Sequence, residues 1–217
     1  MYKAVILDFD GTIFDSYGHS FKRIEEIAWK DGLVITPERK AYMLRIWGQT
    51  GVAFLQNVFL IDEERATRLY MQWERMDLYD PAPFIKGTHQ TLEWLRKKNV
   101  AICMLTSRRL KTLLPLLRDS ALHGHFAYIS AHENNSFHKP DRRAFADIFL
   151  ALKARNITVS ECIFVGDTST DIEAGRNAGV RTLVVETGPY REAYQQTHPV
   201  AETVSYTHLT LPTIYSV

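Results

Sequence analysis

Two aspartates separated by one residue, Asp8 and Asp10, are the first groups in this 217-residue chain that could do chemistry. They directly follow the apolar run Ala4–Leu7 and precede Gly11. A short, wholly apolar run predicts a parallel strand buried on both faces. The aspartates then lie beyond its carboxyl end, where open α/β sheets bind ligands, and Gly11 permits a sharp turn whose N–H groups face an anion. An ordinary strand and polar turn is the alternative.

Three further groups of polar side chains follow later segments of the chain. They are Thr106 with Ser107, Lys139, and Asp167 with Asp171. Right-handed crossovers bring the carboxyl ends of parallel strands to one side of the sheet, where converging carboxylates repel one another without a cation. Oxygen ligands with open positions suit Mg²⁺, which bridges to a substrate phosphate. A carboxylate beside Mg²⁺ can attack phosphorus to form an aspartyl phosphate, helped by a hydroxyl and a lysine.

The elements that must position these groups divide into two parts. Residues 16–80 show apolar residues at helical spacing and no strand. A first helix is expected after Asp15 and ends at Asp31-Gly32, and further helices are expected at about 37–47, 52–59 and 62–78. Asp80-Pro-Ala-Pro83 ends this block. Because the block interrupts a strand-led fold, we expect an inserted all-helical cap, in which the Trp and Tyr side chains pack between helices more often than they stack on a ligand.

Strands and helices alternate after residue 87, which is typical of a parallel sheet. Expected strands are 100–105, 128–130, 162–165 and 182–185. Between them we expect a helix at 88–98, a helix at 110–118 that Pro115 kinks or delays, a helix capped by Asp141, and a helix with a Thr170–Glu173 capping box. The predicted fold class is α/β: a Rossmann-like three-layer parallel-sheet core, residues 1–15 and 81–203, with the cap at 16–80.

The last residues do not continue an α/β domain. Residues 204–217 read as the translation of a transposon-type sequencing adapter, and we expect them to be a non-native tail. The natural protein is then expected to continue into another short strand and helix.

Composition limits the classes of function. Hydrophobic residues make up 46% and charged residues 24%, as in globular proteins, and the formal net charge of +1 argues against a nucleic-acid-binding surface. We find no signal peptide and no apolar stretch near 18 residues, so we expect no membrane partner and a cytoplasmic location. The two cysteines, Cys103 and Cys162, lie in strand-like runs and are expected to be core thiols. The oligomeric state stays open.

The motifs together resemble a known family. DFDGTIFDS (residues 8–16), Thr106, KPD (139–141) and GDTSTD (166–171) are similar to the four motifs of the haloacid-dehalogenase-like hydrolase superfamily. The helical insertion after the first motif resembles the subgroup with a small helical cap, which includes phosphoglycolate phosphatases.

The resemblance implies a role for each motif residue. Asp8 would be the nucleophile and a metal ligand. Asp10 would be the general acid/base and would offer its backbone carbonyl to the metal. Thr106 and Lys139 would hold the phosphoryl group. Asp167 would ligate Mg²⁺, and Asp171 would orient the metal shell and Lys139.

The substrate is expected to contact a second set of residues. Gly11, Thr12 and Ser107 belong to this set through their motifs, and Arg108 adds a guanidinium where many relatives have lysine. The loop 45–51 joins two cap helices, and in the resembling family a loop at this place closes over the leaving group. Arg45 and Gln49 would then contact the substrate, favouring a small acidic phosphoester such as phosphoglycolate. A plain helix connection is the alternative.

The leading hypothesis is a Mg²⁺-dependent phosphatase acting on a small phosphorylated metabolite through an aspartyl-phosphate intermediate. A sugar phosphomutase of the same fold would use the same aspartates while excluding water. A haloacid dehalogenase is disfavoured, since it needs neither an acid at position 10 nor Mg²⁺. A non-catalytic binding protein would show an eroded motif, and no motif is eroded.

Overall fold

The computed structural model describes residues 2–185, 187 and 202–204. The strands are β1 (Ala4–Leu7), β2 (Ala101–Leu105), β3 (Tyr128–Ser130), β4 (Cys162–Gly166), β5 (Arg181–Val185) and β6 (Glu202–Val204). The α-helices are α1 (Tyr17–Lys30), α2 (Pro37–Arg45), α3 (Gly51–Phe59), α4 (Glu63–Tyr79), α5 (Thr88–Lys97), α6 (Leu110–Asp119), α7 (Ala146–Lys153) and α8 (Ser169–Ala178). Short 3₁₀ turns include Arg142–Phe145, which leads into α7. No helix among these is long and apolar enough to cross a membrane.

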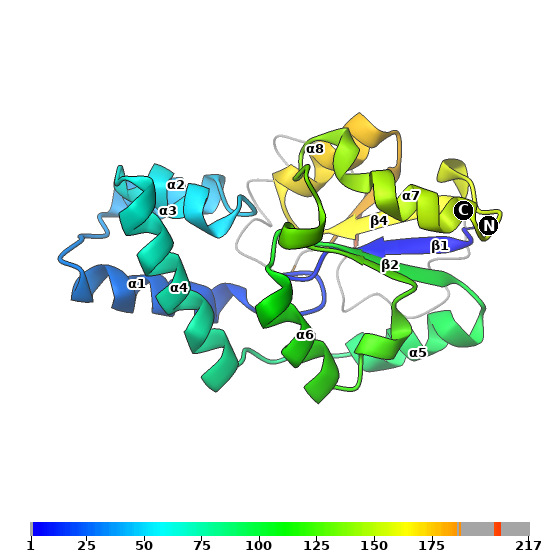
Figure 1. Cartoon of the computed structure of the whole chain (residues 1–217), viewed down its shortest axis with the longest axis horizontal. Coiled ribbons are helices and arrows are strands. Elements are labelled where there is room, and N and C mark those ends of the chain that lie inside the picture. Colours follow the sequence, from blue (N-terminus) through cyan, green and yellow to red (C-terminus); the bar gives the residue numbers. More distant parts are fainter. Residues whose placement is uncertain (1, 186, 188–201, 205–217) are drawn as a thin grey trace.

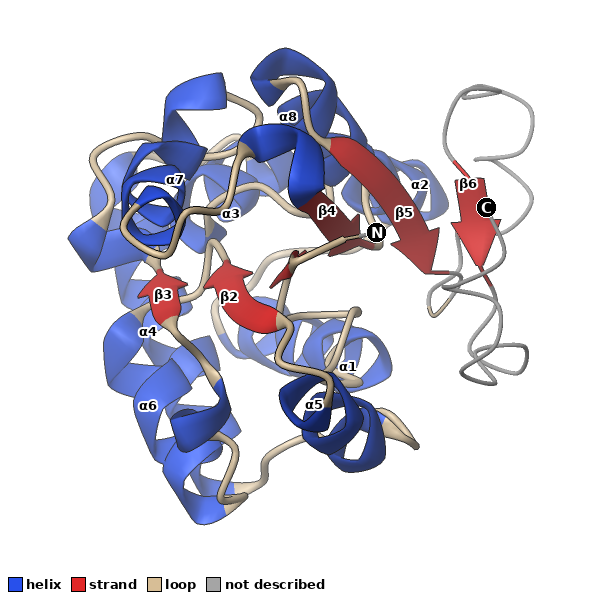
Figure 2. Ribbon diagram, turned by 90° about the vertical axis from the view of Figure 1, so that its right-hand side faces the viewer, coloured by secondary structure: helices blue, strands red, loops and turns tan. Residues whose placement is uncertain are grey.

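One parallel sheet organises the fold. Its strand order is β3-β2-β1-β4-β5-β6, so β1 lies between β2 and β4. Leu7 at the end of β1 is in register with Met104 and Val165. Helices α7 and α8 lie on one face of the sheet and α5 and α6 on the other (Figures 1 and 2). The predicted three-layer α/β class is therefore confirmed, and the crossovers bring the strand ends that carry polar groups to one edge.

The pattern of β1 follows from its central position. Val5 and Leu7 point into the core on one face, and Ala4 and Ile6 into the core on the other. All four residues are buried, as expected for a strand covered by helices on both sides. Phe164 of β4 is fully buried in the second of these cores. A strand covered in this way holds the residue after it, Asp8, in a fixed place.

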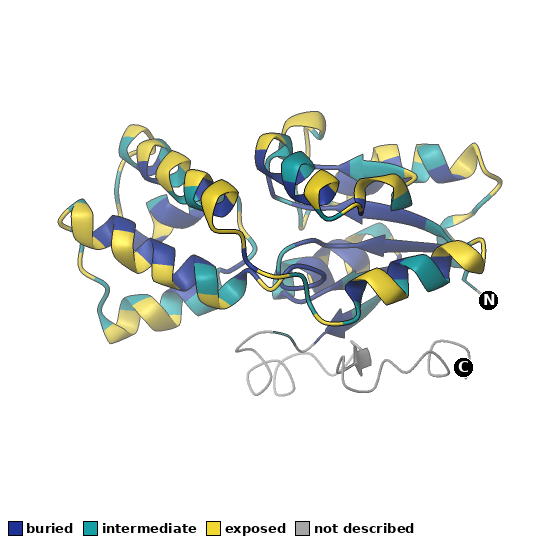
Figure 3. Cartoon of the chain, turned by 90° about the horizontal axis from the view of Figure 1, so that it is seen from below, coloured by how far each residue is buried: buried dark blue, intermediate teal, exposed yellow. Residues whose placement is uncertain are grey.

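The four helices α1–α4 form a separate bundle, which we call the cap. It has a hydrophobic core of its own, rich in aromatic residues such as Trp47, Phe54 and Trp73. The bundle lies beside the carboxyl edge of the sheet (Figure 1), and α4 packs against α6. Buried residues form stripes on the inner faces of its helices (Figure 3). We retain the predicted division, 16–80 against 1–15 and 81–203, as a proposal.

Three local features differ from the sequence analysis. Helix α6 runs without interruption through Pro115. Helix α8 is capped by Thr168 and not Thr170, because β4 extends to Gly166 and the helix begins at Ser169. A sixth strand, β6, pairs with β5 and includes Val204, which the sequence analysis assigned to the tail. Residues 205–217 lie outside the described residues.

Candidate active site

Three buried aspartates come together at the carboxyl edge of the sheet. Asp8 follows β1, Asp167 follows β4, and Asp171 lies in the first turn of α8. One carboxylate oxygen from each lies within 4.8 Å of the others. Asp171 is fixed by its neighbours, since its Oδ2 accepts hydrogen bonds from the backbone N–H and the hydroxyl of Thr168, at 3.0 and 2.6 Å. That carboxylate both caps α8 and faces the site.

Lys139 supplies the positive charge of this cluster. Its Nζ lies 2.8 Å from Asp8 Oδ1 and 2.6 Å from Asp171 Oδ1. The lysine side chain is 4% exposed. Burial alone would lower the pKa of Lys139, but the charges of Asp171 and Asp8 outweigh burial and raise it. Lys139 therefore stays protonated and holds Asp8 in one orientation.

One ammonium does not balance three carboxylates. Burial raises the pKa of Asp8 to about 7, despite the opposing effect of Lys139. Burial, together with the charges of Asp171 and Asp8, raises the pKa of Asp167 well above its usual value. A further cation beside these carboxylates would lower the pKa of both Asp8 and Asp167. The donors are all carboxylate oxygens, which suit Mg²⁺, so Asp8, Asp167 and Asp171 would hold the ion.

The turn after β1 brings the backbone against Asp167. Gly11 has φ +75°, and a Cβ at this position would lie 2.0 Å from Asp167 Oδ2. A side chain at position 11 would therefore collide with the Asp167 carboxylate, so this position requires glycine. Thr12, fully buried, places its hydroxyl 3.5 Å from Asp167 Oδ1. Gly11 and Thr12, which the motifs assigned to substrate binding, therefore lie against the Asp167 carboxylate, and neither lines the cleft described below.

Asp10 lies apart from the three clustered carboxylates. Arg108 binds it with two hydrogen bonds, Nε to Oδ2 at 2.9 Å and Nη2 to Oδ1 at 2.5 Å. The third arm of this guanidinium, Nη1, binds Asp77 Oδ2 of α4 at 2.7 Å. Asp77 in turn pairs with Arg23 of α1. Metal ligation by the Asp10 backbone carbonyl stays a prediction, whereas its carboxylate faces the cap.

A cleft opens between the core and the cap. From the core it is lined by Asp8, Asp10, Thr106, Ser107, Arg108, Thr112, Lys139 and Thr168. From the cap it is lined by Ser20, Trp47, Gly48, Gln49, Gly51, Phe54, Tyr70, Trp73, Glu74 and Asp77. The structure therefore brings together Asp8, Lys139 and Thr106, which the motifs assigned to the phosphoryl group.

The loop between α2 and α3 contacts the core through Gly48. Its φ is +97°, and its carbonyl lies 3.4 Å from the hydroxyl of Ser107. Gln49 lines the cleft and accepts a hydrogen bond from Asn57 at 2.9 Å. Arg45 is exposed, with its guanidinium 4.9 Å from the ring of Tyr42, and it does not line the cleft. Of the predicted specificity residues, the structure brings Gln49 and Arg108 to the cleft but not Arg45.

Helix α4 contributes cleft residues that the sequence analysis did not single out. Tyr70, Trp73, Glu74 and Asp77 line the cleft from this helix. They are spaced i, i+3, i+4 and i+7, which places them on one helix face. Glu74 and Asp77 are two carboxylates on an otherwise apolar helix face, and this pattern in the sequence could have indicated them as candidate site residues. The same aromatic residues also pack within the cap, as the sequence analysis expected.

The fold and the site define a hydrolase of the phosphatase type with a three-layer α/β core and a helical cap. A buried aspartate, a lysine and two further carboxylates lie together at the carboxyl edge of its parallel sheet, beside a helical bundle (Figure 1). The sequence model described as haloacid dehalogenase-like hydrolase matches residues 5–185, and the chain belongs to this family. The resemblance of the four motifs and the predicted enzyme class are confirmed.

Two curated relatives are phosphatases with different substrates in their names. A phosphoglycolate phosphatase from Pseudomonas savastanoi pv. phaseolicola is 26% identical over 215 residues, covering 92% of this chain and 73% of the relative. An N-acetylmuramic acid 6-phosphate phosphatase from Pseudomonas putida is 25% identical over 191 residues, covering 86% and 83%. The chain is similar to both, so these similarities support the enzyme class more than a substrate.

Solved structures show the same fold. A protein from Bacteroides fragilis described as a haloacid dehalogenase-like hydrolase superposes with a TM-score of 0.79 at 22% identity, covering 95% of this chain and 97% of that one. A β-phosphoglucomutase from Clostridium difficile superposes with a TM-score of 0.76 at 20% identity, covering 99% and 96%. The fold is therefore common to hydrolases and mutases.

Proposed function

We propose that the chain is a Mg²⁺-dependent phosphatase that hydrolyses a small phosphorylated metabolite through a phosphoaspartate at Asp8. The observation that carries the proposal is the position of Asp8. It is buried at the end of the central strand, oriented by Lys139, and within 4.8 Å of two further metal-ligand carboxylates. Mg²⁺ held by Asp8, Asp167 and Asp171 supplies positive charge that offsets the charge of the phosphoryl oxygens.

The reaction requires two displacements at phosphorus. An Asp8 carboxylate oxygen bonds to phosphorus as the bond to the leaving oxygen breaks, and Asp10 gives that oxygen a proton. Water then attacks the phosphoaspartate and loses a proton to Asp10, and the bond between phosphorus and Asp8 breaks to release phosphate. Lys139 and Thr106 line the cleft where the phosphoryl oxygens would bind. Arg108 orients the Asp10 carboxylate through both of its oxygens, so one of these hydrogen bonds must open for that oxygen to carry the proton and give it up.

The test compares the protein with Asp8→Asn on p-nitrophenyl phosphate and on phosphorylated metabolites. An amide cannot replace the carboxylate as nucleophile, so the variant should lose on the order of 10⁴-fold or more in kcat while keeping its fold. Turnover should require Mg²⁺, and Ca²⁺ should not replace it because Ca²⁺ accepts more ligands at longer distances. Near-native turnover by Asp8→Asn, or undiminished turnover in EDTA, would contradict the proposal.

The same assay addresses the mutase alternative. A phosphatase releases inorganic phosphate in proportion to the substrate consumed, whereas a phosphomutase returns an isomeric sugar phosphate. The cytoplasmic location stays a prediction that this assay does not address.

A further inference from the structure

One carboxylate oxygen on the cap side of the cleft has no hydrogen-bond partner among the described residues. It is Oε1 of Glu74, whose side chain is 5% exposed. The other oxygen, Oε2, lies 2.8 Å from Lys111 Nζ and 3.3 Å from Arg109 Nη1. A buried acceptor without a partner is unfavourable, and more so if it is charged. Glu74, which lines the cleft, thus carries a buried acceptor for which the described residues provide no donor.

Apart from Lys111 and Arg109, which hold Oε2, the surroundings of Glu74 are aromatic and acidic. Tyr70 and Asp77 flank it on the same face of α4, and the rings of Trp47, Phe54 and Trp73 complete the cap side. No lysine or arginine of the cap is among the residues that line the cleft. The cap side therefore offers ring faces and acceptors to a ligand, and no cation.

The cations on the core side are already paired. Lys139 binds Asp8 and Asp171. Arg108 uses Nε, Nη1 and Nη2 for Asp10 and Asp77. Glu74 is paired with Lys111 and Arg109, and Asp77 with Arg23 and Arg108. A carboxylate on the leaving group would therefore find no unpaired guanidinium among the described residues that line the cleft, and it could not donate a hydrogen bond to Oε1.

We propose that Glu74 selects the leaving group of the substrate, with Oε1 accepting a hydrogen bond from a hydroxyl or ammonium group and disfavouring a carboxylate. This inference rests on the proposed phosphatase function, in which the phosphoryl group lies at Asp8 and the leaving group extends toward α4. The rings of Trp47 and Trp73 add an apolar face for the carbon skeleton, or a cation–π contact for an ammonium. The expected substrate is a phosphate ester of a polyol, a sugar or an amino alcohol.

Ligands that differ in one group give the sharpest test. Phosphoglycolate, 2-hydroxyethyl phosphate and phosphoethanolamine share a two-carbon skeleton and end in a carboxylate, a hydroxyl and an ammonium. We expect kcat/KM at least about tenfold higher for 2-hydroxyethyl phosphate and phosphoethanolamine than for phosphoglycolate. The hydroxyl and ammonium arms then show which donor the site prefers.

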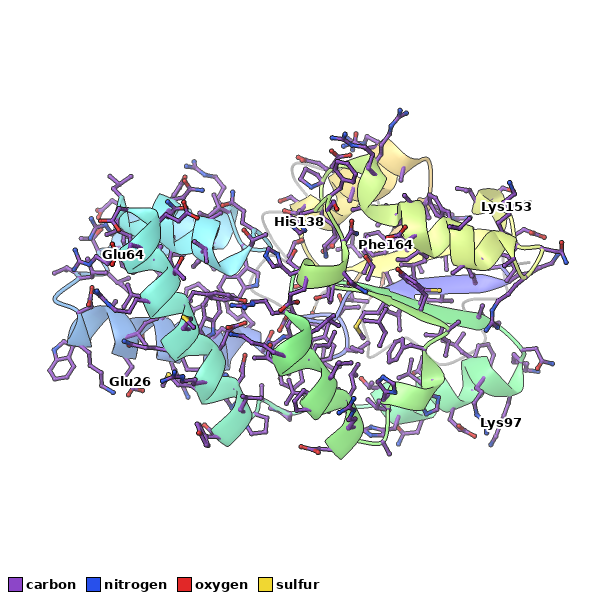
Figure 4. The ribbon with its side chains drawn as sticks, in the orientation of Figure 1. Glu26, Glu64, Lys97, His138, Lys153 and Phe164 are labelled. Atoms are coloured by element: carbon purple, nitrogen blue, oxygen red, sulfur yellow. The ribbon has the colours of Figure 1, made fainter. Side chains whose placement is uncertain are left out.

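Glu74→Gln tests the residue itself. The variant loses the charge but keeps the shape, so the preference for donor-bearing esters should fall at least about tenfold, mainly through KM. p-Nitrophenyl phosphate has no donor on its leaving group, so its kcat/KM should fall less than that of the donor-bearing esters. The matched control is Glu64→Gln on the same helix, since Glu64 is exposed at the end of the cap remote from the core (Figure 4) and should leave every ratio unchanged.

Binding measurements separate this inference from the proposed function. Quenching of tryptophan fluorescence in Asp8→Asn with Mg²⁺, for which Trp47 and Trp73 are the cleft reporters, gives dissociation constants without turnover. If no ester is hydrolysed but the donor-bearing ligands bind tighter and lose this advantage in Glu74→Gln, the proposed function fails and the inference stands. A preference for the carboxylate ligand overturns the inference. So does an equal loss on all esters in a folded Glu74→Gln protein, or no binding of any donor-bearing ligand.

Discussion

Arg108 holds both carboxylate oxygens of Asp10, with Nε 2.9 Å from Oδ2 and Nη2 2.5 Å from Oδ1. A guanidinium that binds a carboxylate through two parallel hydrogen bonds fixes its plane as well as its position. The same guanidinium binds Asp77 of the cap at 2.7 Å. The residue assigned to proton transfer is therefore oriented by an arginine that also ties the core to the cap.

Arg108→Met should destabilise the protein and reduce turnover together. Asp77 is buried and would lose one of its two arginine partners, and removing one member of a buried ion pair costs about 3–5 kcal/mol. Asp10 would also lose its fixed orientation. Thermal denaturation and kcat on a metabolite phosphate would measure the two effects. Arg109→Met, which removes a half-buried arginine from Glu74 and Glu133, is the control for loss of charge. Equal effects in both variants would contradict the assignment.

Asp10→Asn should be selective for the leaving group. If Asp10 protonates the leaving oxygen, the variant should lose roughly 10²–10⁴-fold on esters of poor leaving groups. Activated aryl phosphates need little protonation and should lose much less. Parallel measurements of kcat on 2-hydroxyethyl phosphate and p-nitrophenyl phosphate provide the comparison, and equal losses would remove Asp10 from this role.

Mg²⁺ should stabilise the fold more at pH 8 than at pH 5. The pKa of Asp8 is raised to about 7 in the folded protein from 3.8, so between these values the metal-free folded state binds more protons than the unfolded state. Its free energy of unfolding therefore falls as pH rises through this range, and Asp167 acts in the same direction. Above pH 7 the aspartates no longer need to lose protons to bind the ion.

Thermal denaturation with and without Mg²⁺ at both pH values checks this prediction. Asp171→Asn should reduce the stabilisation by Mg²⁺, because it removes one carboxylate of the three. An increase in Tm that is the same at both pH values would contradict the assignment of the protonated aspartates to the metal site.

Arg45→Ala should leave KM unchanged for phosphoglycolate and for p-nitrophenyl phosphate. The loop sequence predicts that Arg45 binds a carboxylate of the substrate. In the structure its side chain is exposed, lies over Tyr42 and does not line the cleft. A rise in KM confined to phosphoglycolate would show that the loop 45–51 reaches the substrate in another state of the cap. Steady-state kinetics on the two substrates decide between these outcomes.

The sequence determined the core and the reacting groups because both depend on local patterns. A wholly apolar run predicted β1 between layers of helices, and the alternation after residue 87 predicted a parallel sheet. Parallel strands place their carboxyl ends together, so Asp8, Lys139 and Asp167 could be assigned to one site from their order along the chain. The helix spacing of residues 16–80 likewise predicted a bundle without strands.

Only the tertiary structure decided which side chains contact one another in the site. Arg108 and Asp77 are 31 residues apart, and Asp10 and Arg108 are 98 apart, so no local periodicity predicts their contact. The free oxygen of Glu74 depends on how α4 packs against α6, which places Lys111 and Arg109 on its other oxygen. Arg45 shows the reverse case: a glycine-rich loop predicted a ligand contact, but Arg45 is the last residue of α2, and its side chain lies over Tyr42, three residues earlier on the same helix. The contacts between the cap and the core join residues that are far apart in the chain, and the residue pattern within either part does not predict which residues meet.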